Sequence, residues 1–303
     1  MRIAILGATG HVGRSLAAEL GARDGIDLAL VARAPDRARA FAQTRVAGAW
    51  EVASFSELAA VDADLVVQCA GVGDPARLGM DVLEIEERLD ESFLGWLAAH
   101  PSARGVAFSS GAVYDSTFDV PVDDCTPLCD PARTPEAPGE AYAIAKSRSE
   151  ARHRASGLPV VDLRLFGYFT RLIDPDAAFL MNDLVRALRT GTDLVISPGE
   201  IVRDYADPTD LADLVLAAGS SGATESALDV VSASPVSRST LLEHFVASRA
   251  LGYTVRDVGG PASVTGAKPA YYSVSRRAEG VGFRPRHSAI ETLDREVEAL
   301  LMS

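Results

Sequence analysis

The sequence has few cysteines and no long apolar run. It holds 3 cysteines in 303 residues, an odd and small number that does not fit a disulfide framework and is typical of a reducing compartment. No apolar run reaches the ~18 residues that a membrane span requires. The N-terminus shows neither a basic stretch nor an apolar signal core. These absences predict a cytoplasmic protein that makes no contact with a membrane.

Positive charge is also scarce, and lysine almost missing. The chain has 29 Lys plus Arg against 42 Asp plus Glu, a formal charge of −13, which would be repelled by phosphate backbones. We therefore expect no nucleic-acid partner. Only Lys146 and Lys268 are lysines. Cys125 and Cys129 lie in a Pro-rich stretch with no histidine at ligand spacing, so no metal site is expected.

What is present is an ordinary globular composition, 48% hydrophobic and 23% charged, arranged as apolar runs that alternate with helical segments. Such runs are typical of strands buried on both faces. The alternation predicts an α/β fold with a doubly wound parallel sheet of the Rossmann type and a smaller, partly discontinuous C-terminal region. We expect a dinucleotide-binding domain over 1–166 and a mainly substrate-binding region over 167–303, with 194–232 returning to the first domain.

A glycine triplet follows the first apolar run. Gly7, Gly10 and Gly13 stand at relative positions 1, 4 and 7 between a predicted strand and a predicted helix. In a dinucleotide-binding turn the first glycine allows the turn, the second lets the backbone approach a pyrophosphate, and the third lets the helix pack on the strand. The context supports such a site over a glycine-rich turn without a ligand.

The end of the second predicted strand bears on the choice of cofactor. A carboxylate there would bind the ribose 2′-hydroxyl of NAD, but the strand ends in Val31-Ala32-Arg33. Arg33 suits the 2′-phosphate of NADP, which predicts NADP over NAD. The alternative is an arginine on the surface with no such role.

Two further segments carry hydroxyl groups that could take part in catalysis. Tyr142 and Lys146 stand four residues apart on a predicted helix and so share a face. An ammonium beside a tyrosine favours the phenolate, and such a tyrosine can exchange a proton with a carbonyl or hydroxyl oxygen. Ser110 directly follows a predicted strand, where ligands of open α/β sheets bind. Taken alone, these patterns also fit a solvated helix face and a turn.

Together, the glycine triplet, the Ser110 segment and the Tyr142/Lys146 pair resemble the extended short-chain dehydrogenases/reductases, the NAD-dependent epimerase/dehydratase group that acts on nucleotide sugars. The segment Arg203-Asp204-Tyr205 before a predicted helix is similar to the same group. The resemblance implies a nucleoside-diphosphate sugar as substrate and a homodimer formed through the helices predicted at 84–99 and 140–155.

The resemblance also implies roles for individual residues. Ser110 and Tyr142 would be catalytic, and Lys146 would hold the nicotinamide ribose and tune Tyr142. Arg203 would contact the substrate diphosphate, with Asn182 and Arg286 as further candidates for the substrate pocket. The full set expected to bind the cofactor is Gly7, Thr9, Gly10, His11, Val12, Gly13, Arg33, Cys69, Ala70, Gly71, Tyr142 and Lys146.

Some positions depart from the family. Members that dehydrate sugars carry an Asp-Glu pair after the Ser/Thr, where this chain has Gly111 and Ala112. Reductases that also epimerise carry a cysteine there, which is missing too. The family's usual Asn is replaced by Gly167, and its usual Gly after Tyr114 by Asp115.

Without the residues for dehydration or for epimerisation by a cysteine, the family chemistry that remains is hydride transfer at a carbonyl or hydroxyl carbon. We expect an NADPH-dependent reductase of a nucleoside-diphospho 4-keto-6-deoxysugar. One alternative is a nucleotide-sugar 4-epimerase, and an alternative of another class is a catalytically silent NAD(P)-binding regulator.

Overall fold

A seven-stranded parallel sheet forms the centre of the computed structural model, which describes residues 1–71, 79–220, 226–256 and 268–302. The strand order is β3-β2-β1-β4-β5-β6-β9, so the chain starts in the middle and turns back between β1 and β4. Every neighbouring pair in this sheet is parallel, which confirms the predicted doubly wound fold. The strands are β1 (Arg2–Leu6), β2 (Asp27–Ala32), β3 (Ala49–Ser54), β4 (Leu65–Gln68), β5 (Arg104–Ser110), β6 (Val160–Leu165) and β9 (Ala227–Val230).

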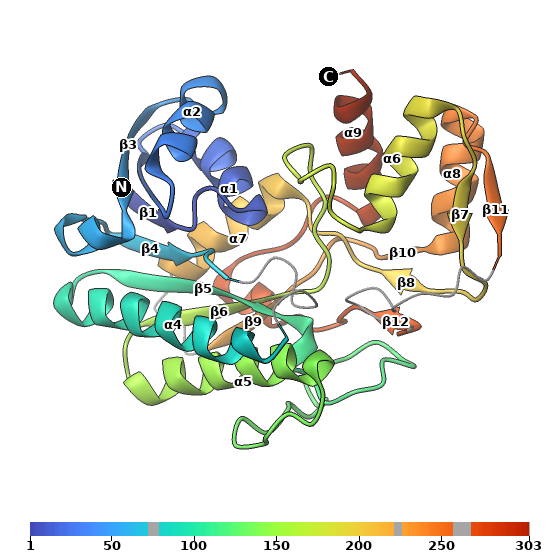
Figure 1. Cartoon of the computed structure of the whole chain (residues 1–303). Coiled ribbons are helices and arrows are strands. Elements are labelled where there is room, and N and C mark those ends of the chain that lie inside the picture. The colour runs from blue at the N-terminus through green and yellow to red at the C-terminus, as the bar shows by residue number, and fades with distance from the viewer. Residues whose placement is uncertain (72–78, 221–225, 257–267, 303) are drawn as a thin grey trace.

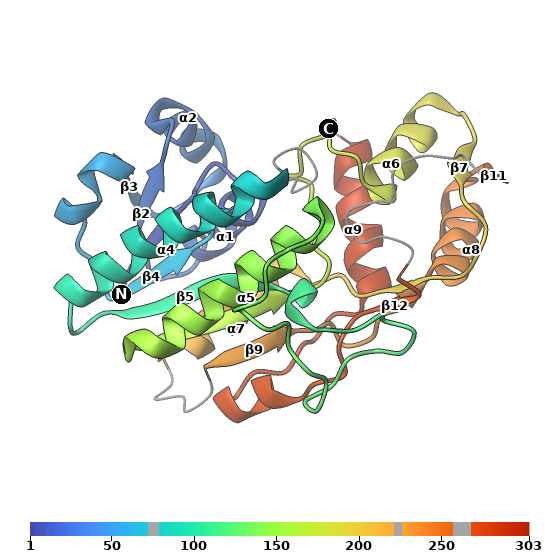
Figure 2. The same cartoon turned by 60° about the horizontal axis from the view of Figure 1, so that its bottom comes forward.

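The unbroken apolar runs reflect burial on both faces of the sheet. Ile3 and Ile5 of β1 pack into the core on one face, and Ala4 and Leu6 pack into the core on the other. Both faces are therefore covered by helices, as Figures 1 and 2 show. One face carries α1 (His11–Gly21), α2 (Pro35–Arg45) and α7 (Pro208–Ser220), and the other carries α4 (Val82–Ala99) and α5 (Pro138–Ser156) side by side.

A second hydrophobic core lies in the C-terminal region, to the right of the sheet in Figure 1. Its helices are α6 (Leu180–Thr190), α8 (Arg238–Arg249) and α9 (Ala289–Leu301). Two small sheets join them, one of β11 (Tyr253–Val255) and β7 (Leu194–Ile196), the other in the order β10 (Val236–Ser237), β8 (Val202–Arg203) and β12 (Ala270–Tyr271). Short 3₁₀ helices are η1 (Phe55–Ala60), η2 (Gly79–Asp81), η3 (Gly111–Val113) and η4 (Arg277–Val281).

The chain returns to the large sheet through α7 and β9, and η4 later packs on the same core through Ala278. The segment expected to return, 194–232, begins with β7 and β8, and these two strands belong to the small sheets instead. The physical reason is that Leu194 and Ile196 are buried in the C-terminal core. Among the described residues, no helix has both the length and the apolar character needed to cross a bilayer.

Candidate active site

The glycine loop between β1 and α1 is shaped by close backbone contacts. Gly7 has φ +86°, and a Cβ added there would lie 2.5 Å from the Ala70 nitrogen at the end of β4. A Cβ on Gly13 would lie 2.3 Å from the Gly7 carbonyl oxygen. Gly10 is exposed and precedes α1 without a side-chain cap. The first amides of α1 can therefore face an anion, as a pyrophosphate requires.

The first turns of α1 also contact the start of the C-terminal region. His11 Nε2 lies 2.9 Å from Thr170 Oγ1, and Ser15 Oγ lies 2.5 Å from the Tyr168 hydroxyl. Burial, helped by the charge of Arg14, lowers the pKa of His11 to about 4. The imidazole is thus neutral at pH 7, and it adds no positive charge to the loop.

Basic residues gather where β2 ends beside the glycine loop. The Val31 carbonyl accepts hydrogen bonds from the amides of Gly7 and Ala8, so exposed Arg33 follows directly at the loop. Partial burial lowers the pKa of Arg14, and repulsion by Arg37 lowers it further. The attraction of Asp174 raises it by less, so the net shift is downward. The Nε of Arg14 is buried and has no hydrogen-bond partner within the described residues. A partly desolvated guanidinium with an unsatisfied N–H favours an anionic ligand.

Ser110 ends β5 and caps η3. Its Oγ accepts a hydrogen bond from the Ala112 amide and lies 3.4 Å from the hydroxyl of Tyr271. Tyr114, at the end of η3, fixes this segment because its hydroxyl donates to Asp229 of β9 and accepts from Arg164 of β6. The Ser110 hydroxyl is therefore held at the carboxyl end of the sheet.

The Tyr142/Lys146 pair of α5 faces inward, which excludes the solvated-face interpretation. Lys146 is buried, and its Nζ donates to Glu86 Oε2 of α4 at 2.9 Å and to the Phe108 carbonyl at 3.1 Å. Burial lowers the pKa of Lys146, but the charge and hydrogen bond of Glu86, together with the charges of Tyr142 and Asp90, outweigh burial and the net shift is upward. A Cβ on Gly71 would lie 3.5 Å from this Nζ, so the ammonium sits beside the segment after β4.

Tyr142 lies one helical turn before Lys146 on α5, the helix that packs against η3. Its side chain is half-buried and packs against the small core of Val82, Ala141 and Ala145. The structure thus packs the helix that carries Tyr142 and Lys146 against the segment that begins with Ser110, whose hydroxyl lies beside that of Tyr271.

The segment Arg203-Asp204-Tyr205 lies next to Gly167. A Cβ on Gly167 would lie 2.3 Å from the Asp204 carbonyl oxygen, which explains why the chain has glycine where the family has asparagine. Arg203 is mostly buried, and its Nη1 donates to the carbonyls of Val202 and Lys268. It also lines a small, mostly apolar cavity with Leu180, Tyr205 and Leu241, among others.

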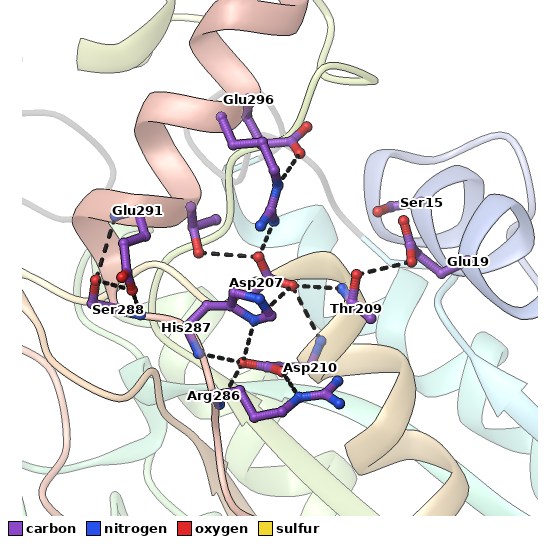
Figure 3. A network of polar contacts seen from close by, with 12 residues as sticks. Ser15, Glu19, Asp207, Thr209, Asp210, Arg286, His287, Ser288, Glu291 and Glu296 are labelled. Carbon is purple, nitrogen blue, oxygen red and sulfur yellow. Dashed lines mark hydrogen bonds and ion pairs between the residues drawn. The ribbon is translucent and has the colours of Figure 1, made fainter. Parts of the chain in front are cut away.

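Two residues expected near the substrate are engaged elsewhere. The Asn182 amide donates to the carbonyls of Asp174 and Ala177, so it holds the chain that leads into α6. Arg286 forms ion pairs with Asp210 and Asp213 of α7, and Figure 3 shows it in the network around Asp207 and His287. The structure does not bring either side chain to the hydroxyl group at Ser110.

The acidic cluster in Figure 3 is held together by its own partners. Asp207, Asp210 and His287 have the spacing of metal ligands, but Asp207 also binds Arg295 and caps the start of α7 through the Thr209 amide. Ion pairs and a helix cap account for these carboxylates.

Sequence reasoning missed Glu86, Tyr271 and the contact of Lys268 with the site. Glu86 stands in a helix rich in acids, and nothing in its sequence context separates it from its neighbours. Tyr271 lies 161 residues from Ser110. Lys268 is one of only two lysines in the sequence, but no pattern around it indicates a role.

Comparisons with known proteins agree on one family. The family model described as "NAD dependent epimerase/dehydratase family" matches residues 3–230. No curated protein matches the sequence significantly.

Solved structures share the fold at low identity. A UDP-glucuronic acid 4-epimerase from Bacillus cereus, in complex with UDP-glucuronic acid and NAD, is 15% identical with a TM-score of 0.78, over 100% of this chain and 99% of that one. A UDP-glucose 4-epimerase from Thermotoga maritima is 18% identical with a TM-score of 0.76, over 98% of both chains.

A dTDP-glucose 4,6-dehydratase from Bacillus anthracis, in complex with NAD, is 14% identical with a TM-score of 0.74, over 98% of this chain and 96% of that one. These likenesses establish the fold, and the family match covers three quarters of the sequence. The chain belongs to the NAD dependent epimerase/dehydratase family, a group of extended short-chain dehydrogenases/reductases.

Proposed function

We propose that this protein is an NADPH-dependent reductase of the 4-keto group of a nucleoside-diphospho sugar, with a 4-keto-6-deoxysugar as the preferred substrate. The observation that carries the proposal is that the helix of Tyr142 and Lys146 packs against the segment that begins with Ser110 at the carboxyl end of the sheet. The Lys146 ammonium also lies beside the segment after β4. The carboxyl end of the strands is the edge at which open α/β sheets bind their ligands.

The glycine loop and its surroundings fit a dinucleotide. The exposed Gly10 and the uncapped start of α1 suit a pyrophosphate, and Gly7 and Gly13 leave room for nothing but hydrogen. Arg33 is exposed directly after β2, beside the glycine loop, and the buried Nε of Arg14 has no hydrogen-bond partner among the described residues. Asp36, the acid nearest to Arg33 in sequence, belongs to the first turn of α2. This charge pattern supports NADP over NAD.

When bound, NADPH supplies the hydride to the keto carbon of the sugar. Tyr142 donates its phenolic proton to the oxygen that gains negative charge, and Ser110 orients that oxygen through a hydrogen bond. Lys146 keeps an ammonium one helical turn from the phenol and stabilises the phenolate that remains. A solvent proton then restores the phenol.

Dehydration is disfavoured by the shape of the site. A Cβ on Gly111 would lie 2.3 Å from the Phe166 ring, so no carboxylate fits at this position. Elimination of water from a sugar needs an acid and a base, and the segment after Ser110 supplies neither.

The second candidate is a nucleotide-sugar 4-epimerase. It is favoured by the fold likeness to the UDP-glucuronic acid and UDP-glucose 4-epimerases. An epimerase would use the same tyrosine and return the hydride to the opposite face of the sugar.

A test that separates the two candidates follows absorbance at 340 nm with purified protein, NADPH and the dTDP, UDP, GDP and CDP forms of a 4-keto-6-deoxysugar. We expect steady NADPH consumption with one nucleotide form and slower consumption with NADH. Release of tightly bound NAD on denaturation, together with C4 epimers formed without absorbance change, would instead establish the epimerase. A protein that binds dinucleotide and supports neither reaction would be the silent regulator.

A further inference from the structure

Two cations converge on the ring of Tyr271. The Nζ of Lys268 lies 4.8 Å from the Tyr271 ring centroid and 4.4 Å from that of Phe118, and the Cζ of Arg203 lies 5.9 Å from the Tyr271 centroid. The strands place them together, because Arg203 pairs with Tyr271 between β8 and β12 and donates to the Lys268 carbonyl. Cation–π contact orients both groups without neutralising their charge.

Neither cation has an acidic partner among the described residues. The Arg203 guanidinium donates to carbonyl oxygens, and burial lowers the pKa of both Arg203 and Lys268. The buried Arg164, by contrast, forms an ion pair with Glu150. In a chain with a charge of −13, two neighbouring cations held away from carboxylates are poised for an external anion.

The pair borders the reactive hydroxyls. The Tyr271 hydroxyl lies 3.4 Å from Ser110 Oγ, while its ring faces the two cations. Phe118, which supports Lys268, has φ +58°, a costly conformation for a bulky residue. Its carbonyl accepts a hydrogen bond from the Ala270 amide, which fixes the ring beneath the ammonium.

We propose that Lys268 is a substrate-binding residue that forms, with Arg203, a two-cation subsite for an anionic group of the nucleotide sugar. The group is an oxyanion, either the diphosphate or a carboxylate on the sugar. Tyr271 joins this subsite to the reaction centre by contacting Ser110 with its hydroxyl and the cations with its ring. That the ligand is a nucleotide sugar rests on the proposed function; the two-cation subsite itself does not.

The rarity of lysine provides a direct test. Protein labelled with [¹³Cε]lysine gives two side-chain signals, from Lys146 and Lys268, which Lys268→Arg assigns. We expect the pH titration of the Lys268 signal to move upward when inorganic pyrophosphate or glucuronate is added, because a bound anion stabilises the ammonium. Lys146, which is buried against Glu86, serves as the internal control and should not respond.

The two probes separate the two sources of the anion. A response to pyrophosphate assigns the subsite to the diphosphate, and a response to glucuronate alone assigns it to a sugar carboxylate. No response to either, at matched ionic strength, overturns the inference. The measurement needs no turnover, so it is independent of whether the reductase proposal holds.

A binding measurement completes the test. Lys268→Met should weaken the calorimetric affinity for the nucleotide sugar found to be turned over, or for UDP-glucose if none is, by about 10- to 100-fold. The affinity for NADPH should stay the same, which checks that the variant is folded. Unchanged affinity for the nucleotide sugar would contradict a substrate-binding role.

Discussion

At the scale of single residues, the site depends on how charge is held inside the protein. Lys146 stays an ammonium although it is buried, because Glu86 lies 2.9 Å away. The sequence predicted the lysine and its tyrosine from helical spacing alone. It could not predict Glu86, which approaches from another helix, because a contact between helices leaves no local pattern.

Replacing Tyr142 tests the proton donor. Tyr142→Phe removes only the hydroxyl, and we expect turnover to fall by about 10²- to 10⁴-fold, the usual contribution of a general acid. The dissociation constant of NADPH should change little, and fluorescence titration measures it. Tyr253→Phe, on an exposed tyrosine of β11, is the matched control and should be fully active. A Tyr142→Phe enzyme with full activity would remove the tyrosine from the mechanism.

Replacing Arg33 or Arg14 tests the cofactor preference. Each guanidinium lost from a 2′-phosphate should raise the KM for NADPH by about 10- to 100-fold, the value of a hydrogen bond between charged groups. The KM for NADH should not change, since that cofactor lacks the phosphate. Arg39→Ala, exposed on α2, is the control. Equal effects on both cofactors would mean that these arginines do not read the phosphate.

At the scale of elements, the packing of helices on strands explains which sequence patterns were informative. Gly13 was predicted to let α1 approach the strand. In the structure, a Cβ at this position would lie only 2.3 Å from the Gly7 carbonyl oxygen. The large strands were predicted because two-sided burial demands unbroken apolar runs. The small strands β8, β10 and β12 have two residues each, too few to carry a pattern.

The close contact of α1 can be tested with a pair of alanine variants. Gly13→Ala should lower the free energy of unfolding by roughly 1–3 kcal/mol, because a backbone oxygen cannot move aside. Gly95→Ala, in the exposed middle of α4 with open space around it, should instead raise it by up to about 1 kcal/mol. Urea denaturation measures both. An unchanged free energy of unfolding for Gly13→Ala would show that α1 can move away from the Gly7 loop without cost.

The contact between α4, α5 and β6 contains a charged histidine. The Nδ1 of His153, on α5, lies 2.7 Å from Asp162 Oδ1, and its Nε2 lies 3.4 Å from Asp90 Oδ1. Burial lowers its pKa, but the two carboxylates outweigh burial and raise the pKa to about 9. Because the folded pKa exceeds the unfolded value of 6.5, its contribution to stability is complete below pH 6.5 and is lost as the pH rises through 9.

The unfolding free energy should therefore fall by on the order of 2–3 kcal/mol between pH 6.5 and 9. His153→Gln should flatten this dependence, measured by urea denaturation at several pH values. His244→Gln, at a partly exposed histidine, should leave it in place. A variant at His153 that keeps the full pH dependence would assign the effect to other groups.

At the scale of the whole molecule, the site is built from segments far apart in the chain. The glycine loop, Ser110 and Tyr142 belong to the large sheet and its helices, and Arg203, Lys268 and Tyr271 come from the C-terminal region. Motifs with fixed spacing made the first group predictable from the sequence. Of the second group, the resemblance implied only Arg203, whereas the placement of Lys268 and Tyr271 depends on long-range strand pairing. Asn182 and Arg286 were expected at the substrate, but a backbone carbonyl and the carboxylates of α7 engage them elsewhere. A homodimer through α4 and α5 stays a prediction.

The central claim is that the hydride reaching C4 of the sugar comes from added NADPH. The most direct test incubates the protein with NADPH that carries deuterium at nicotinamide C4, prepared in both stereoisomers, and a nucleoside-diphospho 4-ketosugar. We expect one deuterium at sugar C4 from one of the two isomers, seen by mass spectrometry and proton NMR. A product that carries no deuterium from either isomer, formed with a cofactor that the protein never releases, would contradict it.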